Sequence, residues 1–398
     1  MAKCPLCEGK NLSKIFEAQN AFVSVADLTN DSFDDTGGGG NPYCKGDLMI
    51  ELMQCLDCSY TFNALFDRQK MQEAYFKHTY ITPMAISNTI SSHILNLSDK
   101  IKSYAKSSSV GLEIAPGSCD LVKALAGDFE FFYTIDPSFT PQNLLANEKN
   151  VMHLRSLFDD EKLRGNLKHK IDFVIFRHLL EHIDIPREFL ESVVRLLDNG
   201  AMIYIETPNA EEIFESKRFY EIRHEHCGYW DKATLCNALA LLGCELVESV
   251  EYYEKQWIGL FLKKTGNTLK RLPILLYDEN LTRALNLEIA KLENALSAFK
   301  SVAIYGAGSH ANSLITYLSE ESCRKIKCAI DKDERRVGSY LQNSNIVIKS
   351  NAIKNLQDIE CVLMCMPCYE RIVFEKELKE CFKGKVILSA KGIQCLTL

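Results

Sequence analysis

Residues 110–119, which read VGLEIAPGSC, decide the fold of this chain. The first five form a short apolar run typical of a buried strand, and a turn containing proline and glycine follows it. A helical stretch over 120–126 leads to a second apolar run, 131–135, which Asp136 closes. A strand, a glycine turn, a helix and a strand ending in an acid predict the start of an open parallel α/β sheet.

The alternation of apolar runs and helical stretches continues beyond this unit. We expect further strands at 150–154, 171–176, 201–209, 243–250 and 257–262, and a helix at 186–197. Ligands of open α/β sheets bind outside the carboxyl ends of the strands. The residues that follow the predicted strands are therefore the first candidates for a binding site.

Four of the sixteen cysteines form two C-x-x-C pairs, Cys4 with Cys7 and Cys55 with Cys58. This spacing lets both thiolates of a pair reach one ion, so the two pairs together predict a closed structural zinc site. Cys44 lies between the pairs and is an alternative ligand. A redox C-x-x-C is the competing interpretation, but no strand-to-helix context of the thioredoxin type surrounds either pair.

A second strand–turn–helix pattern opens at residues 301–311, which read SVAIYGAGSHA, and Asp331 ends the next predicted strand. A Gly-x-Gly turn with an acid about twenty residues further on is the dinucleotide fingerprint, which taken alone suggests NAD. A long helix is expected before it, within 265–300. Its apolar residues approximate a stripe that faces a core: Leu285, Leu287, Ile289, Leu292, Leu296 and Phe299.

Three stretches of the middle region resemble class I S-adenosylmethionine-dependent methyltransferases. They are 113–118 (EIAPGS), 135–138 (IDPS) and 172–183 (DFVIFRHLLEHI). With the cysteine pairs and the segment 221–226 (EIRHEH), nearly the whole chain resembles the three-domain sugar C-methyltransferases, which act on nucleotide-linked keto-sugars.

The resemblance implies an α/β protein of three domains. A zinc-binding domain is expected at 1–68, a Rossmann-like class I methyltransferase domain at 69–264, and a second Rossmann-like domain at 265–398 that helps to form the substrate cleft. In this family the carboxy-terminal domain is not known as a redox site, so bound NAD is the lesser alternative there.

The resemblance also implies a site for S-adenosylmethionine at the carboxyl edge of the predicted sheet. Asp136 is expected to take both ribose hydroxyls, although an ordinary turn acid before Pro137 is the alternative. The residues expected to hold or line the donor site are Glu113, Ala115, Gly117, Asp136, Ser156, Arg177 and His178.

The catalytic base implied by the resemblance is His226, which would remove the acidic proton next to a ketone and leave an enolate. Glu225 and His224 are expected to orient His226 or to contact sugar hydroxyls, and Tyr80 is expected to face the same cleft. Alternatives for the His–Glu–His cluster are a metal site or a surface loop without function.

This chain departs from the family pattern at four places, the first being the loop between Ala115 and Cys119, which keeps only Gly117 where the family is richer in glycine. Arg223 stands where the family commonly has tyrosine, which points to a different or more anionic substrate. His178 replaces an asparagine, and residues around Trp257 replace a Gly-Gly-Ser stretch. The methylated atom therefore stays open: methylation of oxygen or nitrogen on a sugar or small metabolite is one alternative, and a non-catalytic nucleotide-binding scaffold is another.

Composition and charge exclude some classes of binding partner and indicate the cellular compartment. The formal net charge is −7, so the basic footprint of a nucleic-acid or anionic-membrane binder is absent. No apolar run is long enough to span a membrane, and the first residues carry no apolar signal core. We expect a cytoplasmic protein that binds a small molecule, most simply a nucleotide sugar.

Overall fold

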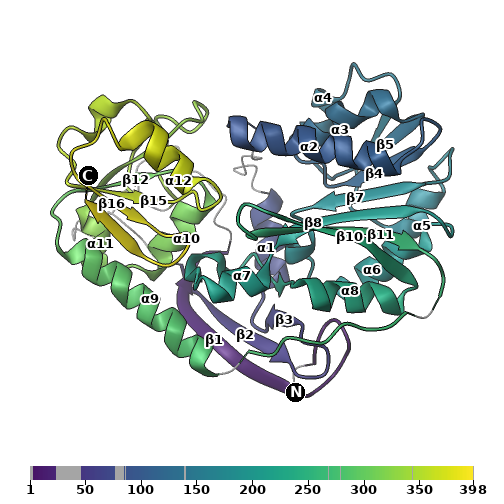
Figure 1. Cartoon of the computed structure of the whole chain (residues 1–398), viewed down its shortest axis with the longest axis horizontal. Helices are drawn as coiled ribbons and strands as arrows, with labels where there is room; N and C mark the ends of the chain where they lie inside the picture. The colour runs from purple at the N-terminus through teal and green to yellow at the C-terminus, as the bar shows by residue number, and fades with distance from the viewer. Residues whose placement is uncertain are drawn as a thin grey trace.

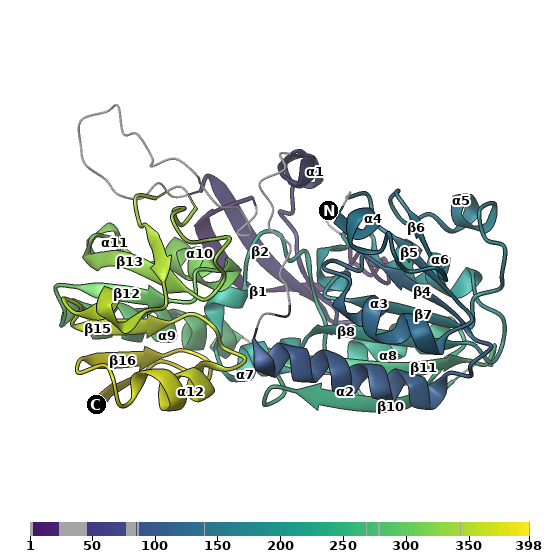
Figure 2. The same cartoon turned by 90° about the horizontal axis from the view of Figure 1, so that it is seen from above.

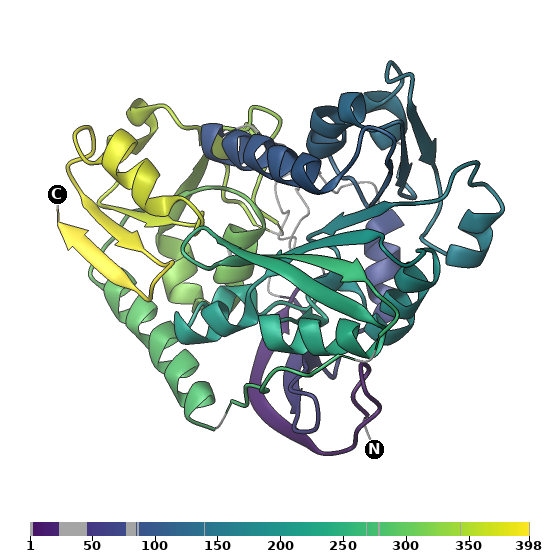
Figure 3. The ribbon, with the colours of Figure 1, turned by 45° about the vertical axis from the view of Figure 1, so that its right-hand side comes forward.

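A computed structural model gives the structure of the chain, and the residues that it describes form three β-sheets (Figure 1). The seven-stranded sheet and the six-stranded sheet lie on opposite sides of the molecule, with strands β1 and β2 below and between them (Figures 1 and 3). The residues that the structure describes are 3–23, 46–76, 85, 87–138, 140–267, 269–277, 279–342 and 344–397.

The central seven-stranded sheet confirms the α/β prediction for the middle region. Its strand order is β10-β11-β8-β7-β4-β5-β6, and all neighbours are parallel except that β11 runs antiparallel to both β8 and β10. The strands are β4 (Val110–Ile114), β5 (Phe131–Ile135), β6 (Val151–Leu154), β7 (Phe173–Arg177), β8 (Met202–Pro208), β10 (Cys244–Tyr252) and β11 (Trp257–Lys264).

Helices cover both faces of this sheet, because its strands carry apolar side chains on both sides. Helices α2 and α3 pack on one face, while α5, α6 and α8 pack on the other (Figure 1); Figure 2 looks onto the face that carries α2 and α3. The helices of the middle region are α2 (Asn88–Tyr104), α3 (Asp120–Leu125), α4 (Thr140–Leu144), α5 (Asp160–Arg164), α6 (Pro186–Arg195), α7 (Ala210–Glu215) and α8 (Lys232–Leu241).

The amino-terminal sheet is antiparallel, with the order β1-β2-β3-β9. Its strands are β1 (Leu12–Ala21), β2 (Leu48–Cys55), β3 (Thr61–Asn63) and β9 (Gly228–Tyr229), and helix α1 (Arg68–Phe76) follows β3. Thr61 pairs with Tyr229 and Phe62 with Gly228. The middle region thus contributes the last strand of the first sheet, directly after the predicted base His226.

The carboxy-terminal sheet has the order β14-β13-β12-β15-β16-β17 and is parallel except for β17. Its strands are β12 (Val302–Tyr305), β13 (Ile326–Asp331), β14 (Ile348–Ser350), β15 (Cys361–Met364), β16 (Lys385–Leu388) and β17 (Gln394–Thr397). Its helices are α9 (Glu279–Ser297), α10 (Ser309–Tyr317), α11 (Glu320–Lys325) and α12 (Glu370–Val373).

The long helix α9 joins the amino-terminal and carboxy-terminal sheets, since it packs against β1 at one end and on the last sheet along its length. Leu285, Leu292 and Leu296 are fully buried, as the apolar stripe predicted. Leu287 is 54% exposed, so its assignment to the stripe was wrong. Residue 287 lies two positions from Leu285, which is half a helical turn away from the buried face.

Among the described residues, no helix has the length and apolar character needed to cross a membrane.

Candidate active site

The register of the central sheet brings the predicted donor residues to one edge. Ile114 at the end of β4 pairs with Ile135 on β5 and with Phe176 on β7. Asp136 comes directly after β5, and Arg177 is the last residue of β7. The two residues therefore lie on either side of the turn that begins at Ala115. The chain leaves β4 and β7 in opposite directions along the sheet, and this is the kind of switch point where open α/β sheets bind their ligands.

The turn after β4 has an unusual backbone. Ala115, Gly117 and Cys119 have φ values of +54°, +55° and +61°, in the left-handed region that residues with a Cβ adopt at a cost. The Ala115 N–H donates to the Ile135 carbonyl at 2.9 Å and holds the turn against β5. The small side chain of Ala115 and the absent side chain of Gly117 allow a ligand to lie against this backbone.

Glu113 lies beneath this turn and is buried, with 1% of its surface exposed. Its Oε1 is 3.6 Å from Nε of Arg177, while its Oε2 is buried without a hydrogen-bond partner. Burial raises the pKa of Glu113 to about 7, against the lowering effect of Arg177. An unpartnered buried acceptor is costly, so this oxygen fits an N–H or O–H donor of bound S-adenosylmethionine.

Asp136 and Ser156 follow the next two strands of the same edge. Oδ1 of Asp136 accepts the Ser138 N–H at 2.7 Å, the turn geometry that was the alternative for this acid. The bond engages one of the two carboxylate oxygens. Ser156 is exposed after β6, and its hydroxyl donates to the Leu157 carbonyl at 2.6 Å. Both residues thus lie where the sequence predicted, at the carboxyl ends of β5 and β6.

Replacing Asp136 by alanine is expected to weaken the affinity for S-adenosylhomocysteine about 10- to 100-fold, the size of one or two hydrogen bonds to a charged group. Isothermal titration calorimetry measures this directly. Asp128→Ala is the matched control, because Asp128 is an acid at the opposite, amino end of β5. Equal affinities of the wild-type protein and Asp136→Ala would remove Asp136 from the donor site.

A buried network of charges continues from Arg177 into the sheet. Glu206 on β8 is fully buried and receives hydrogen bonds from His93 on α2 at 2.9 Å and from the Tyr204 hydroxyl at 2.7 Å. Nη1 of Arg177 and Nε2 of His178 lie 3.5 Å and 3.2 Å from its Oε1. Although burial opposes it, His178 and His93 hold the pKa of Glu206 well below its usual range.

His226 lies next to this edge, in a second cluster just beyond β7. Its ring is 5.0 Å from that of His182, which belongs to the short helix Leu180–His182, and atoms of Glu181, His182 and His226 lie within 4.8 Å of one another. Nε2 of His226 accepts a hydrogen bond from Nε of Arg223 at 3.1 Å. The neutral ring therefore carries its proton on Nδ1.

The other two members of the predicted cluster, His224 and Glu225, form hydrogen bonds with other parts of the chain. Both ring nitrogens of His224 bond to the amino-terminal part of the chain: Nε2 accepts the Asp67 N–H at 2.9 Å, and Nδ1 is 3.1 Å from the Val23 carbonyl. The carbonyl of Glu225 is 3.0 Å from Nδ1 of His182. His224, Glu225 and His226 are all buried, so the surface-loop interpretation is wrong.

Several residues that contact the predicted site residues at this edge were not anticipated from the sequence. Glu206 and Glu181 contact the predicted residues, and Trp257 packs edge-on against His178 with centroids 4.3 Å apart. A signal for Glu206 existed, because it is an acid inside an otherwise apolar predicted strand, 201–209. Tyr80, predicted to face the cleft, lies outside the described residues, as does Cys44.

The two C-x-x-C pairs come together as predicted. Sγ of Cys4 is 3.7 Å from Sγ of Cys58, Sγ of Cys7 is 3.5 Å from Sγ of Cys55, and all four lie within 4.8 Å of one another. Sulfurs that bind tetrahedral zinc at 2.3 Å are about 3.8 Å apart. The four side chains therefore fit one zinc ion, which would hold the two chain segments together.

In the carboxy-terminal sheet, the acid of the predicted dinucleotide fingerprint, Asp331, accepts a hydrogen bond from the glycine turn. Asp331 accepts the Ala307 N–H at 2.7 Å and the Asp333 N–H at 2.9 Å. The carboxylate that the dinucleotide fingerprint assigns to a ribose is thus engaged by the turn itself.

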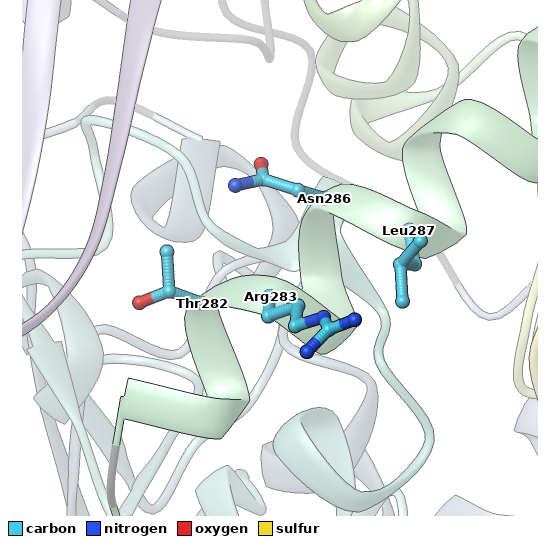
Figure 4. A pocket seen from close by; sticks show the side chains of 4 residues that line it. All are labelled: Thr282, Arg283, Asn286 and Leu287. Atoms are coloured by element: carbon cyan, nitrogen blue, oxygen red, sulfur yellow. The ribbon is translucent and has the colours of Figure 1, made fainter.

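A surface pocket of about 560 Å³ lies along α9, lined by Thr282, Arg283, Asn286 and Leu287 (Figure 4). None of the predicted site residues lines it. The pocket is therefore separate from the carboxyl edge of the central sheet, where the titratable residues gather.

Residues 87–249 match a family model described as a methyltransferase domain. Similar solved structures include a putative methyltransferase from Bacillus halodurans C-125, with 14% identity over 43% of this chain and 98% of that chain and a TM-score of 0.35. The N-methyltransferase NodS from Bradyrhizobium japonicum WM9, in complex with S-adenosyl-L-homocysteine, has 13% identity over 48% and 97% and a TM-score of 0.38.

A SAM-dependent methyltransferase from Aquifex aeolicus has 19% identity over 44% of this chain and 98% of that chain, with a TM-score of 0.34. These structures are too distant from the chain to carry an argument about its substrate. No curated protein matches the chain.

Proposed function

We propose that this chain is a class I S-adenosylmethionine-dependent methyltransferase, since residues 87–249 match a methyltransferase-domain model, and that it methylates a carbon next to the carbonyl of a nucleotide-linked keto-sugar. His226 is the proposed base. The observation that carries the proposal is a buried, neutral imidazole beside the donor edge. The family resemblance of the 221–226 segment supports the substrate class.

His226 is held in the protonation state that a base requires. Burial, the Arg223 guanidinium and the neighbouring His182 hold the pKa of His226 well below its usual range, against the opposing charge of Glu221. The ring is therefore neutral at neutral pH, and its unprotonated nitrogen is Nε2, which faces Arg223. Acceptor binding has to break the bond from Arg223 before Nε2 can take a proton.

The reaction proceeds by loss of the C–H proton to Nε2 of His226, while the bonding electrons move toward the carbonyl oxygen and leave an enolate. Bound S-adenosylmethionine supplies an electrophilic methyl group on a sulfonium. The enolate carbon forms the new C–CH₃ bond as the S–CH₃ bond breaks, and S-adenosylhomocysteine leaves. The protein's part is to hold the two reactants in line and to keep water away from the enolate.

The four-cysteine site supports the base indirectly, and we propose that it holds a structural zinc ion. Tyr60, two residues after Cys58, packs on Trp230 with ring centroids 4.5 Å apart. Strand β3 then pairs with β9, whose Gly228 has room only for hydrogen, because a Cβ there would lie 2.0 Å from the Tyr60 hydroxyl. The metal module therefore fixes the chain on the carboxyl side of His226.

The experiment that tests the proposed function follows both the methyl group and the carbon-bound proton. The enzyme is incubated in D₂O with a nucleotide-linked 4-keto-6-deoxyhexose, once with S-adenosylmethionine and once with S-adenosylhomocysteine. We expect methylation at carbon 3 in the first reaction and deuterium exchange at that carbon in the second.

Other products would reassign the function. An O- or N-methylated product without exchange would contradict the enolate route and favour the alternative methyl transfer. Binding of S-adenosylhomocysteine with neither exchange nor transfer, across a panel of nucleotide sugars and small metabolites, would favour a non-catalytic nucleotide-binding scaffold.

A further inference from the structure

His178 occupies the switch point of the central sheet, directly after β7. Its φ is +49°, in the left-handed region that is uncommon for residues other than glycine, although asparagine, aspartate and histidine adopt it more often than most. The His178 N–H donates to the Glu206 carbonyl at 2.8 Å, so the neighbouring strand holds this conformation. Backbone strain of this kind is found at sites where a side chain must point in one direction.

The His178 ring lies between two carboxylates. Nε2 is 3.2 Å from Oε1 of Glu206, and Nδ1 is 3.7 Å from Oε1 of Glu181. Neither contact is a well-formed hydrogen bond, because Nε2 has no aligned partner and the Nδ1 distance is too long. Nε2 is buried against Glu206, whereas the His178 side chain as a whole is 32% exposed, so the Nδ1 side of the ring is the side that a ligand can reach.

The charges around the ring favour its cationic form. Glu181 from the Leu180–His182 helix and Glu206 from β8 face it, and Arg177 on its own strand lies beyond Glu206. Burial alone would lower the pKa of His178, but the two carboxylates outweigh it and raise the pKa to about 9. His178 and His226 are thus driven to opposite protonation states, the pattern expected of an acid and a base in one site.

We propose that His178 is a second catalytic residue of the methyl transfer, an imidazolium that donates a hydrogen bond to the carbonyl oxygen of the acceptor. This inference rests on the proposed function. Glu181 supplies the geometric link, because its carboxylate contacts His178 on one side and lies within 4.8 Å of the His226 ring atoms on the other.

The two histidines divide the enolisation between them. The C–H bond breaks and its proton goes to Nε2 of His226, while the electron pair moves onto the carbonyl oxygen. The N–H of His178 stabilises the negative charge that develops on this oxygen. When the methyl group is transferred, the electrons return to the carbon and form the C–CH₃ bond, and His178 keeps its proton throughout.

The catalytic test compares His178→Ala and His178→Asn with the exposed control His169→Ala. The readouts are the rate of deuterium exchange into a nucleotide-linked 4-keto-6-deoxyhexose and the affinity for S-adenosylhomocysteine. We expect His178→Ala to lower the exchange rate about 10²–10³-fold, the loss typical of one oxyanion donor, measured at saturating S-adenosylhomocysteine so that a change in donor binding does not enter the rate. Asparagine tolerates the left-handed backbone and keeps an N–H donor, so His178→Asn should lose less.

A second measurement is made on the wild-type protein, and a variant serves only to assign the signal. In wild-type protein with ¹⁵N-labelled histidine, the His178 ring, assigned by its loss in His178→Asn, should remain protonated at pH 7.5 and titrate near pH 9. A neutral ring at pH 7.5, or an exchange rate that His178→Ala leaves unchanged, would overturn the inference and leave the proposed function standing. Absence of exchange in the wild-type enzyme itself would overturn both.

Discussion

Replacing His226 by alanine is expected to lower the turnover of methyl transfer by about 10²–10⁴-fold, the usual contribution of a positioned general base. The affinity for S-adenosylhomocysteine is expected to stay at the wild-type value, because the donor residues Glu113 and Asp136 lie on β4 and after β5, away from the 221–226 segment. Initial rates and calorimetric titrations measure the two quantities separately. Wild-type turnover in His226→Ala would show that His226 is not the base.

Arg223→Gln provides the matched control, since it removes a neighbouring charge and leaves the base in place. Arg223 lowers the pKa of His226, so its removal raises that pKa. The base is active only when neutral, and the acid limb of the pH–rate profile should therefore move to higher pH. A shift to lower pH would contradict the assignment of His226 as the base whose pKa sets this limb.

Replacing Cys55 by serine is expected to abolish zinc binding and to lower the melting temperature of the protein strongly. Structural zinc sites contribute several kcal/mol to folding, up to apparent binding energies of about 10–16 kcal/mol in small zinc modules. Metal analysis should find about one zinc ion per wild-type chain and almost none in Cys55→Ser. Thermal unfolding followed by circular dichroism measures the loss of stability.

We expect the loss of zinc also to disturb the proposed active site, because strand pairing and a hydrogen bond connect the two. The second cysteine pair leads into β3, which pairs with β9 directly after His226, and His224 accepts the Asp67 N–H. Cys395→Ser on the exposed edge strand β17 is the control and should change neither property. Metal-free wild-type protein that melts at the temperature of the zinc-loaded protein would contradict a structural metal.

The parts of the fold that could be predicted from the sequence are those fixed by local pattern. The inner strands β4, β5, β7 and β8 are largely apolar runs because helices bury both faces of the sheet, and such runs are visible without any knowledge of their neighbours. The acid after β5 and the cysteine spacing are local signals too, and the structure places these residues at the sheet edge and in one cluster.

The parts that could not be predicted depend on residues distant in sequence. Strand β9 has two residues, too short for a periodic pattern, and exists because β3 pairs with it. His224 and His226 are two positions apart, but the turn between them sends one toward Asp67 and the other toward His182. Glu181 comes near both His178 and His226 only through the fold, since the two histidines are distant in sequence.

The central claim is that the carboxyl edge of β4 and β5 binds the methyl donor, and a crystal structure of the complex with S-adenosylhomocysteine tests it most directly. We predict the adenosine against the backbone of Ala115 and Gly117, with both ribose hydroxyls on the Asp136 carboxylate. Electron density for the nucleoside at the Gly306–Gly308 turn of the carboxy-terminal sheet, with protein side chains filling the edge of β4 and β5, would contradict the claim.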